Sequence, residues 1–260
     1  MLQIAVIIAN RNNARYLDEC LRSVLRQTLL PREIIVVDDA STDDSGELLE
    51  SYRSKGMITL LTNNTGMGVA ASRHRGVMAC ESPFFTTLDA DDYYFSADKL
   101  AAESRCLESQ TRPGSIAFSD VMRVDASGVR RGLVSEKRQI REGDLSFRIP
   151  HLSGFIPRDY LVAKEDYIAV GGFNSLLGLY EDWDLKIRLS RRCPWIFSGT
   201  VGTAYRDNPQ GLSKSPKRQH VAAMRSIFVS HCSSGNSLVR ATRLVRFFFY
   251  HSFYLRRLAI

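Results

Sequence analysis

The sequence of 260 residues lacks any run of 18 uncharged apolar residues, the length that a membrane-spanning helix needs. It begins directly with a strand-like apolar run, without the basic leader and small-residue cleavage site of a secretory signal. The apolar fraction of 44% and the charged fraction of 24% are typical of a globular protein. We therefore expect a soluble protein with neither a transmembrane span nor a leader.

Paired cysteines are also lacking. The five cysteines are odd in number, widely separated, and show no Cys-x-x-Cys spacing: Cys20, Cys80, Cys106, Cys193 and Cys232. This pattern argues against both a disulfide framework and a zinc site. We expect buried or half-buried thiols in a protein of the reducing cytoplasm.

Acidic residues are missing from position 208 to the C-terminus, a stretch that holds nine of the 35 Lys and Arg residues. The remainder has 26 basic and 28 acidic residues, so the net charge of +7 belongs to the tail. An anionic partner is expected there. Residues 238–260 mix Phe, Tyr and Leu with Arg, and two interpretations stay open: an interfacial segment on the inner face of a membrane, or a helix packed on the body.

Strand and helix patterns alternate over the first third of the chain, as in a mostly parallel α/β sheet flanked by helices. Gln3–Ala9 and Glu33–Asp38 are continuous apolar runs typical of strands buried on both faces. Ser41, three residues before Asp44, predicts a capping box for the following helix. We predict one domain over residues 1–207, divided after 119 into two halves, and a basic helical extension over 208–260.

Two predicted strands end in acidic clusters, Asp38-Asp39 and Asp89-Ala90-Asp91-Asp92. The carboxyl ends of parallel strands share one edge of a sheet, where ligands bind. A single Asp at such a place more often starts a turn or caps a helix. Three adjacent carboxylates repel one another, however, and a hard cation such as Mg²⁺ or Mn²⁺ would compensate them.

Four ordered stretches carry a more specific signal: IAVIIANRNN, YLDECLRSVLRQTLLPREIIVVDDASTDDS, NTGMGVAASRHRG and FFTTLDADD. They closely resemble the nucleotide-sugar-binding half of the family 2 glycosyltransferases, strongly over residues 3–92 and more weakly to about 192. The resemblance implies a GT-A fold and an inverting, metal-dependent transfer from a nucleotide diphosphate sugar to a hydroxyl acceptor. UDP is the first candidate nucleotide. A glycan or lipid-linked acceptor in bacterial surface polysaccharide or glycoconjugate synthesis would fit this family.

The resemblance also assigns donor-side residues, which comprise a base pocket, an arginine that approaches the donor, and metal-binding acids: Ala9, Asn10, Arg11, Asp38, Asp39, Arg73, Asp89 and Asp91. Within this set Asp39 is expected to accept a hydrogen bond from the base, with Asp38 assisting. Asp91 is expected to bind the metal directly, and Asp89 to lie on the ribose side and near the metal.

The acceptor side is predicted from Gly171-Gly172-Phe173 and from the stretch that begins at Tyr180 with YEDWDL, both of which resemble family motifs. Asp182 is the expected catalytic base and Glu181 the neighbour that orients it, at a helix N-terminus that favours ionised acids. Gly172 and Trp183 are expected to contact the acceptor, although Trp183 would equally suit a packing role. Where many relatives carry a metal-binding His, this chain reads Tyr205-Arg206-Asp207-Asn208, so the third protein ligand is left open.

Other functions remain as alternatives. A nucleotidyltransferase on a similar sheet would lack the Glu181-Asp182 motif, and a dinucleotide oxidoreductase would need a Gly-x-Gly-x-x-Gly after its first strand. A non-catalytic binder of nucleotide sugars or nucleic acid would suit the basic tail. We expect no nucleic-acid partner, because the acidic crevice would repel phosphates in the absence of metal.

Overall fold

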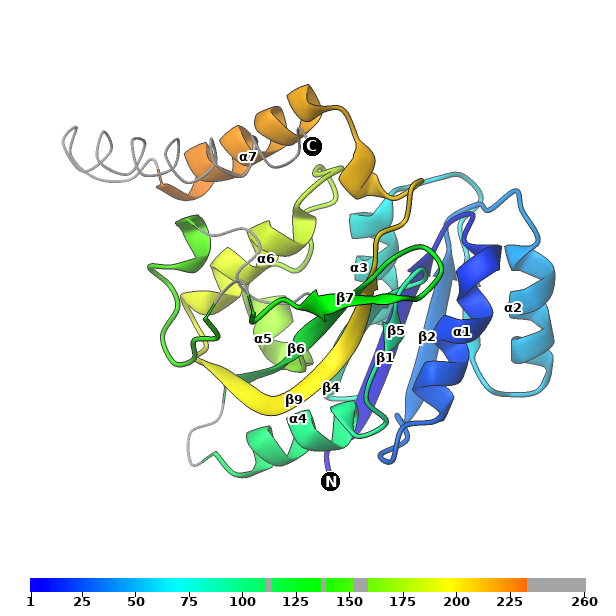
Figure 1. Cartoon of the computed structure of the whole chain (residues 1–260), viewed down its shortest axis with the longest axis horizontal. Helices are drawn as coiled ribbons and strands as arrows, with labels where there is room; N and C mark the ends of the chain where they lie inside the picture. The colour runs from blue at the N-terminus through cyan, green and yellow to red at the C-terminus, as the bar shows by residue number, and fades with distance from the viewer. Residues whose placement is uncertain (111–113, 137–138, 152–158, 233–260) are drawn as a thin grey trace.

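The computed structural model describes residues 1–110, 114–136, 139–151 and 159–232. Its larger sheet has five strands in the order β3-β2-β1-β4-β8 (Figure 1). The strands are β1 (Ile4–Asn10), β2 (Glu33–Asp38), β3 (Thr59–Thr62), β4 (Phe84–Asp89) and β8 (Val162–Ala163). The first four are parallel and β8 is antiparallel to β4. The predicted α/β fold class is therefore confirmed.

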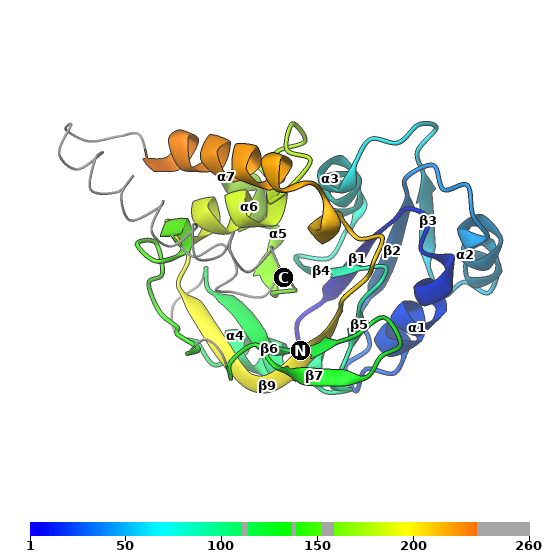
Figure 2. The ribbon, with the colours of Figure 1, turned by 45° about the horizontal axis from the view of Figure 1, so that its top comes forward.

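Alternation along β1 explains why both faces of this sheet are covered. Ala5 and Ile7 point into one hydrophobic cluster, whereas Ile4, Val6 and Ile8 point into the other. Helix α3 (Val69–Ala79) covers the first face, and α1 (Ala14–Leu25) and α2 (Ser45–Ser54) cover the second (Figure 2). Gly76 lets α3 approach closely, because a Cβ there would lie 2.5 Å from Ile7 Cγ2.

A second sheet in the order β5-β9-β6-β7 was not predicted. It consists of β5 (Tyr93–Tyr94), β6 (Ile116–Val124), β7 (Arg130–Leu133) and the long β9 (Trp195–Arg206). Strand β6 pairs with β9 in parallel, and α4 (Lys99–Glu108) packs against both. Strand β6 runs across the predicted division at residue 119 and so ties the two halves together.

After β7 the chain forms the short turn η1 (Ile149–His151), α5 (Lys164–Ala169) and α6 (Glu181–Ser190), and a second short turn, η2 (Leu212–Lys214), follows β9. Beyond them, α7 (Lys217–Cys232) lies against α6 (Figure 1). Met224, Ile227 and Phe228 of α7 belong to the same core cluster as Trp183. This part of the predicted extension thus packs on the body, and the rest of the tail lies outside the described residues.

Two simpler expectations have different outcomes. Within the described ranges, no helix is long and apolar enough to cross a bilayer. The capping box, in contrast, is wrong: Asp44 occupies the N-cap of α2 without a side-chain cap bond, and Ser41 binds Asp38 instead. The hydroxyl of Ser41 donates to the carboxylate of Asp38 at 2.6 Å, a contact that the local sequence does not reveal.

Candidate active site

Polar side chains gather where the parallel strands end. Asn10 ends β1, Asp38 ends β2, Asn63 follows β3, and Asp89 ends β4. In the strand register Asn10 lies beside Asp38, and Ala9 lies beside Asp89. The two acidic clusters therefore flank β1 at one edge, two strand spacings or about 10 Å apart. This edge is where the sequence predicted a crevice.

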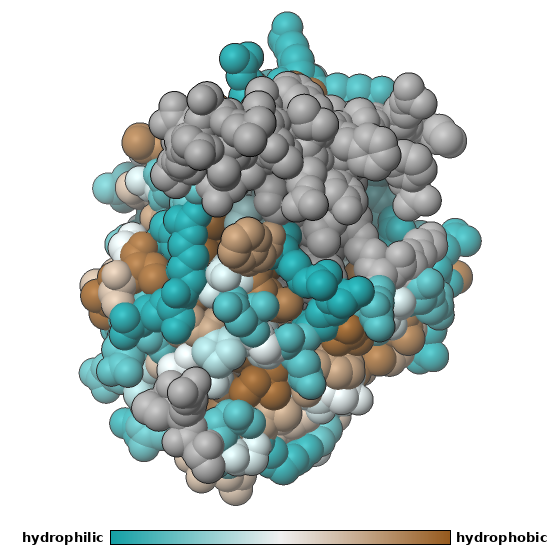
Figure 3. Space-filling model, turned by 90° about the vertical axis from the view of Figure 1, so that its left-hand side faces the viewer, coloured by the Kyte–Doolittle hydropathy of each residue, from teal (hydrophilic) through white to brown (hydrophobic). Residues whose placement is uncertain are grey.

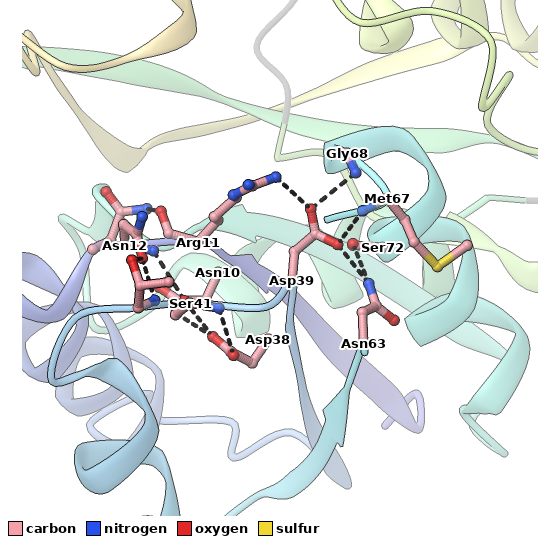
Figure 4. A network of polar contacts seen from close by, with 12 residues as sticks. Asn10, Arg11, Asn12, Asp38, Asp39, Ser41, Asn63, Met67, Gly68 and Ser72 are labelled. Atoms are coloured by element: carbon pink, nitrogen blue, oxygen red, sulfur yellow. Dashed lines mark hydrogen bonds and ion pairs between the residues drawn. The ribbon is translucent and has the colours of Figure 1, made fainter. Parts of the chain in front are cut away.

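Asp38 is bound within its own turn (Figure 4). Its Oδ1 accepts hydrogen bonds from Asn10 Nδ2 at 2.8 Å and from Ser41 Oγ at 2.6 Å, and its Oδ2 accepts one from Ser41 N at 3.1 Å. Ser41 Oγ also accepts a bond from Asn12 N. Asp38 and Asn10 thereby fix the loop after β1 against the loop after β2.

Asp39 connects the same loop to the N-terminus of α3 (Figure 4). Its Oδ1 accepts bonds from Asn63 Nδ2 at 2.6 Å and Met67 N at 2.8 Å, and its Oδ2 accepts one from Gly68 N at 2.9 Å. Burial alone would raise the pKa of Asp39, but these hydrogen bonds outweigh it and lower the pKa. Asp39 is therefore held as an oriented carboxylate.

Arg11 lies above this carboxylate, with its Nη1 3.7 Å from Asp39 Oδ2 and more than half of its side chain exposed. Gly66 leaves the space that the guanidinium occupies, since a Cβ at Gly66 would lie 2.0 Å from Arg11 Nη1. Because Gly66 has no side chain, Arg11 can lie beside Asp39, the predicted base-binding acid.

Asp89, Asp91 and Asp92 have carboxylate oxygens within 4.8 Å of one another. Asp89 and Asp91 are half-buried and Asp92 is buried. Three close oxygen ligands of this kind suit a hard divalent cation, so the donor set fits Mg²⁺ or Mn²⁺. Asp92 Oδ1 accepts a bond from Arg206 N at 2.8 Å, which also makes it a link to the end of β9.

Asn208 is a site residue that the sequence reasoning did not select. Its Nδ2 donates to Asp91 Oδ2 at 2.8 Å, and the residue is only 7% exposed. Arg206 holds the segment in place, because its Nε donates to the backbone oxygen of Asp91 at 2.9 Å. The stretch in which the family resemblance predicted a metal-binding His therefore reaches the acidic cluster through the amide of Asn208.

Arg73 joins the acids at the end of β4 to the start of α6. It is buried, and its two terminal nitrogens bind different acids: Nη2 binds Asp89, and Nη1 binds Glu181 Oε1 at 2.5 Å. The guanidinium also lies 5.8 Å from the ring centroid of Phe173. The sequence placed Arg73 near the donor; the structure places it between the strand-end acid and the first turn of α6.

Glu181 and Asp182 begin α6 immediately after Tyr180, whose φ of +61° is in the left-handed region. Burial raises the pKa of Glu181, Arg73 opposes this effect, and the charge of Asp182 adds to it. Asp182 is 19% exposed and accepts a bond from Lys186 Nζ at 2.8 Å. Of the two adjacent acids, Asp182 is the more accessible.

The two residues predicted to contact the acceptor, Gly172 and Trp183, lie in different environments. Trp183 has no exposed surface and donates its Nε1 to Ile149 O at 2.7 Å, so it packs in the core and the acceptor-stacking role is wrong. Gly172 has a φ of +67°, and a Cβ there would lie 2.9 Å from both His74 Nδ1 and Tyr167 Oη. His74 shares a 2.7 Å hydrogen bond with Tyr167 Oη, which fits a structural role.

The known proteins that this chain resembles are glycosyltransferases. A family model described as "Glycosyl transferase family 2" matches residues 5–155. An uncharacterized glycosyltransferase of Bacillus subtilis, EpsJ, is 33% identical over 94 residues, which cover 36% of this chain and 27% of that protein. The match thus spans little more than a quarter of that relative.

Solved glycosyltransferase structures have the same GT-A fold. S. aureus TarS in complex with UDP-GlcNAc has a TM-score of 0.73 at 19% identity, covering 96% of this chain and 72% of that one. The mannosyltransferase PcManGT from Pyrobaculum calidifontis, in complex with GDP-Man and Mn²⁺, has a TM-score of 0.66 at 17% identity. It covers 96% of this chain and 70% of that one.

Proposed function

Since the chain belongs to glycosyl transferase family 2, we propose that it transfers a sugar from a nucleotide diphosphate donor to a hydroxyl acceptor with inversion. The observation that carries the proposal is the bridge made by Arg73, which contacts Asp89 on the donor side and Glu181 on the acceptor side. A UDP-sugar is the first candidate donor, in keeping with the UDP-GlcNAc bound to the TarS structure.

The base pocket of this proposal consists of Asn10, Arg11 and Asp39, with Ala9 beside them on β1. The oriented Asp39 carboxylate accepts an N–H of the nucleobase, in the manner of its present bonds from Met67 and Gly68. Arg11, mostly exposed, presents a cation to the same ligand. Asp38 does not contact the base itself in this proposal. Its hydrogen bond with Asn10 fixes the end of β1 that leads to Arg11.

Asp182 is the proposed general base, and it takes the proton of the acceptor hydroxyl as that oxygen attacks the anomeric carbon. Such proton transfer contributes about 10²–10⁴-fold in rate. Glu181, buried against Arg73, orients the start of α6 and does not exchange a proton. A divalent cation bound at Asp91 and Asp89 would neutralise negative charge on the leaving diphosphate.

The base assignment is tested with Asp182→Asn, which should leave donor affinity near normal and reduce turnover by two orders of magnitude or more. Asp98→Asn is a matched control that should keep full activity, because this half-exposed acid precedes α4 and pairs with Arg105 on the surface. Weakened donor binding with intact turnover in Asp182→Asn would refute the assignment.

The metal site is tested with Asp91→Ala and calorimetric titration of UDP-sugars with and without Mn²⁺. Loss of the metal-dependent part of donor binding is expected, and identical titrations for both proteins would reject the site. A screen of UDP-, TDP- and GDP-sugars by thermal shift with Mn²⁺ identifies the donor.

The reaction class is tested by product NMR and by donor hydrolysis. An inverted anomeric centre is expected, and a retained one would exclude the single displacement. Absence of turnover with every donor, despite binding, would favour the non-catalytic binder, and release of pyrophosphate would favour a nucleotidyltransferase.

A surface glycan or lipid-linked acceptor is part of the proposal, and so is contact with an anionic bilayer through the basic C-terminal region, which would bring the protein to a lipid-linked acceptor. Helix α7 exposes Arg218, Val221, Arg225 and Val229, and no acidic residue occurs after position 207. The end of the molecule shown in Figure 3 mixes hydrophilic and hydrophobic side chains. Flotation with phosphatidylglycerol liposomes should recover the full chain, and flotation that is equal with neutral liposomes would argue against charge-driven binding.

A further inference from the structure

Lys186 is one of the largest side chains that are fully buried in the described part of the protein. It lies on α6 four residues after Asp182, so both side chains share one face of the helix. Its ammonium donates to Asp182 Oδ2 at 2.8 Å. Burial of an ammonium is costly unless a carboxylate compensates its charge. The ion pair between Lys186 and Asp182 is therefore a structural part of the first turns of α6.

The two adjacent acids are thereby paired with two different cations. Arg73 reaches Glu181 from α3, and Lys186 reaches Asp182 from within α6. The two pairs differ in exposure, since the carboxylate of Asp182 is 19% exposed and that of Glu181 is 7% exposed. A lysine that binds Oδ2 of the more accessible acid restricts rotation of the carboxylate.

From this geometry we infer that Lys186 is a positioning residue for the reaction: through their buried ion pair it holds Asp182 ionised and in a fixed orientation for the acceptor hydroxyl. The inference rests on the proposed function, because it requires Asp182 to be the base. An ammonium 2.8 Å away stabilises the ionised carboxylate over the protonated one. Lys186 therefore extends the pH range in which the base is active toward acid.

The described part of the chain places several other charged and titratable groups near Asp182. Glu181 is its neighbour on α6, Tyr160 precedes β8, and Arg73 and Arg188 act on Tyr160 from α3 and α6. Burial, followed by the charge of Asp182, raises the pKa of Tyr160, which stays neutral throughout the range of interest. Glu181 is the one acid among these neighbours whose titration would be mistaken for that of Asp182.

The test is the pH profile of kcat/KM for Lys186→Met, which keeps the length of the side chain and removes its charge. The acid limb should move to higher pH by about 1 unit or more, and kcat should fall while KM for the donor stays within about twofold. Lys186→Arg should restore the limb of the unaltered protein. Glu181→Gln, measured in parallel, should keep an acid limb, displaced if at all to lower pH because a neighbouring negative charge is removed. A limb that persists without Glu181 is assigned to Asp182.

Lys164→Met is the matched control, since this half-buried lysine donates to the backbone oxygens of Cys80 and Met78 and not to a carboxylate. Its acid limb should not move. If Lys186→Met fails to fold, as judged by circular dichroism, Lys186→Gln gives the same readout.

A fall in activity of Lys186→Met with an unmoved acid limb, or an arginine variant that behaves like the methionine variant, would overturn the inference. Full turnover by Asp182→Asn would instead overturn the proposed base itself. The two failures are therefore distinguishable.

Discussion

Arg73 Nη1 lies 2.5 Å from Glu181 Oε1, which connects the middle of α3 to the first residue of α6 across 108 positions of sequence. Both side chains are almost fully buried. Because the other terminal nitrogen of Arg73 binds Asp89, one side chain holds the end of β4 and the start of α6 in a fixed relation. The relative placement of these two elements therefore depends on Arg73.

Replacement of Arg73 by Met should therefore reduce both stability and activity. It leaves Glu181 as a buried carboxylate without its cation, and breaking a buried pair in this way costs about 3–5 kcal/mol. Urea denaturation should show the loss, and turnover should fall with it. Arg53→Met is the control, because its ion pair with Glu50 is exposed and contributes little. Equal midpoints for the two variants would show that the bridge is not structural.

Asn208→Asp tests how the acidic cluster tolerates further charge. The variant replaces an amide that donates to Asp91 by a carboxylate, so four acids then repel one another without metal. The melting temperature should fall in EDTA and recover with Mn²⁺. Asn64→Asp, at an exposed position, should show neither effect. A melting temperature independent of metal in both variants would argue against cation binding at this cluster.

The part of this architecture that the sequence predicted is the part with local signals. Continuous apolar runs marked β1 and β2, and the acids that follow β2 and β4 lie at one edge because parallel strands place their carboxyl ends there. The second sheet escaped prediction for the opposite reason. Strand β9 contains Gly199 and Gly202, shows no clean alternation, and depends on pairing with the distant β6.

Side-chain roles in the site were less predictable than its position. Whether Trp183 meets a ligand or the core depends on Ile149, which accepts its N–H, and no pattern near Trp183 reveals that partner. The contact between Asn208 and Asp91 had a usable signal, since Asn208 belongs to the stretch in which the family resemblance predicted a metal-binding His, and an amide oxygen is also a ligand for hard cations. The charge relation between Asp182 and Lys186 was visible as an i, i+4 pair, but its burial was not.

The pH dependence of stability should carry a contribution from Glu103, which is fully buried beside Lys99. Burial raises the pKa of Glu103 from 4.5 to about 7, although Lys99 and a hydrogen bond from Ser119 oppose the shift. The folded state thus holds a proton that the unfolded state releases between about pH 4.5 and 7. Its stabilising contribution is complete below pH 4.5 and is lost as the pH rises to about 7.

Glu103→Gln removes this titration, so the free energy of unfolding of the unaltered protein should fall relative to that of the variant across this window. A rise from 4.5 to about 7 corresponds to about 3 kcal/mol at 1.36 kcal/mol per pKa unit. Urea titrations at pH 4.5 and pH 7.5 measure the difference. Parallel changes in both proteins would mean that Glu103 does not titrate in this range.

Gly172→Ala should destabilise the acceptor side for two separable reasons. The left-handed φ of +67° costs a residue with a Cβ about 1–2 kcal/mol, and the added methyl would lie 2.9 Å from His74 Nδ1 and Tyr167 Oη, where overpacking costs about 1–3 kcal/mol more. Gly171→Ala isolates the backbone effect, because Gly171 has a φ of +83° with no atom near a Cβ, and Gly178→Ala, which meets neither condition, is the baseline. Melting temperatures should fall in the order Gly178, Gly171, Gly172, with turnover reduced most in the last. A Gly172→Ala protein as stable as the Gly171→Ala protein would mean that the hydrogen bond between His74 and Tyr167 yields to the methyl group, and that this contact does not fix the loop before α6.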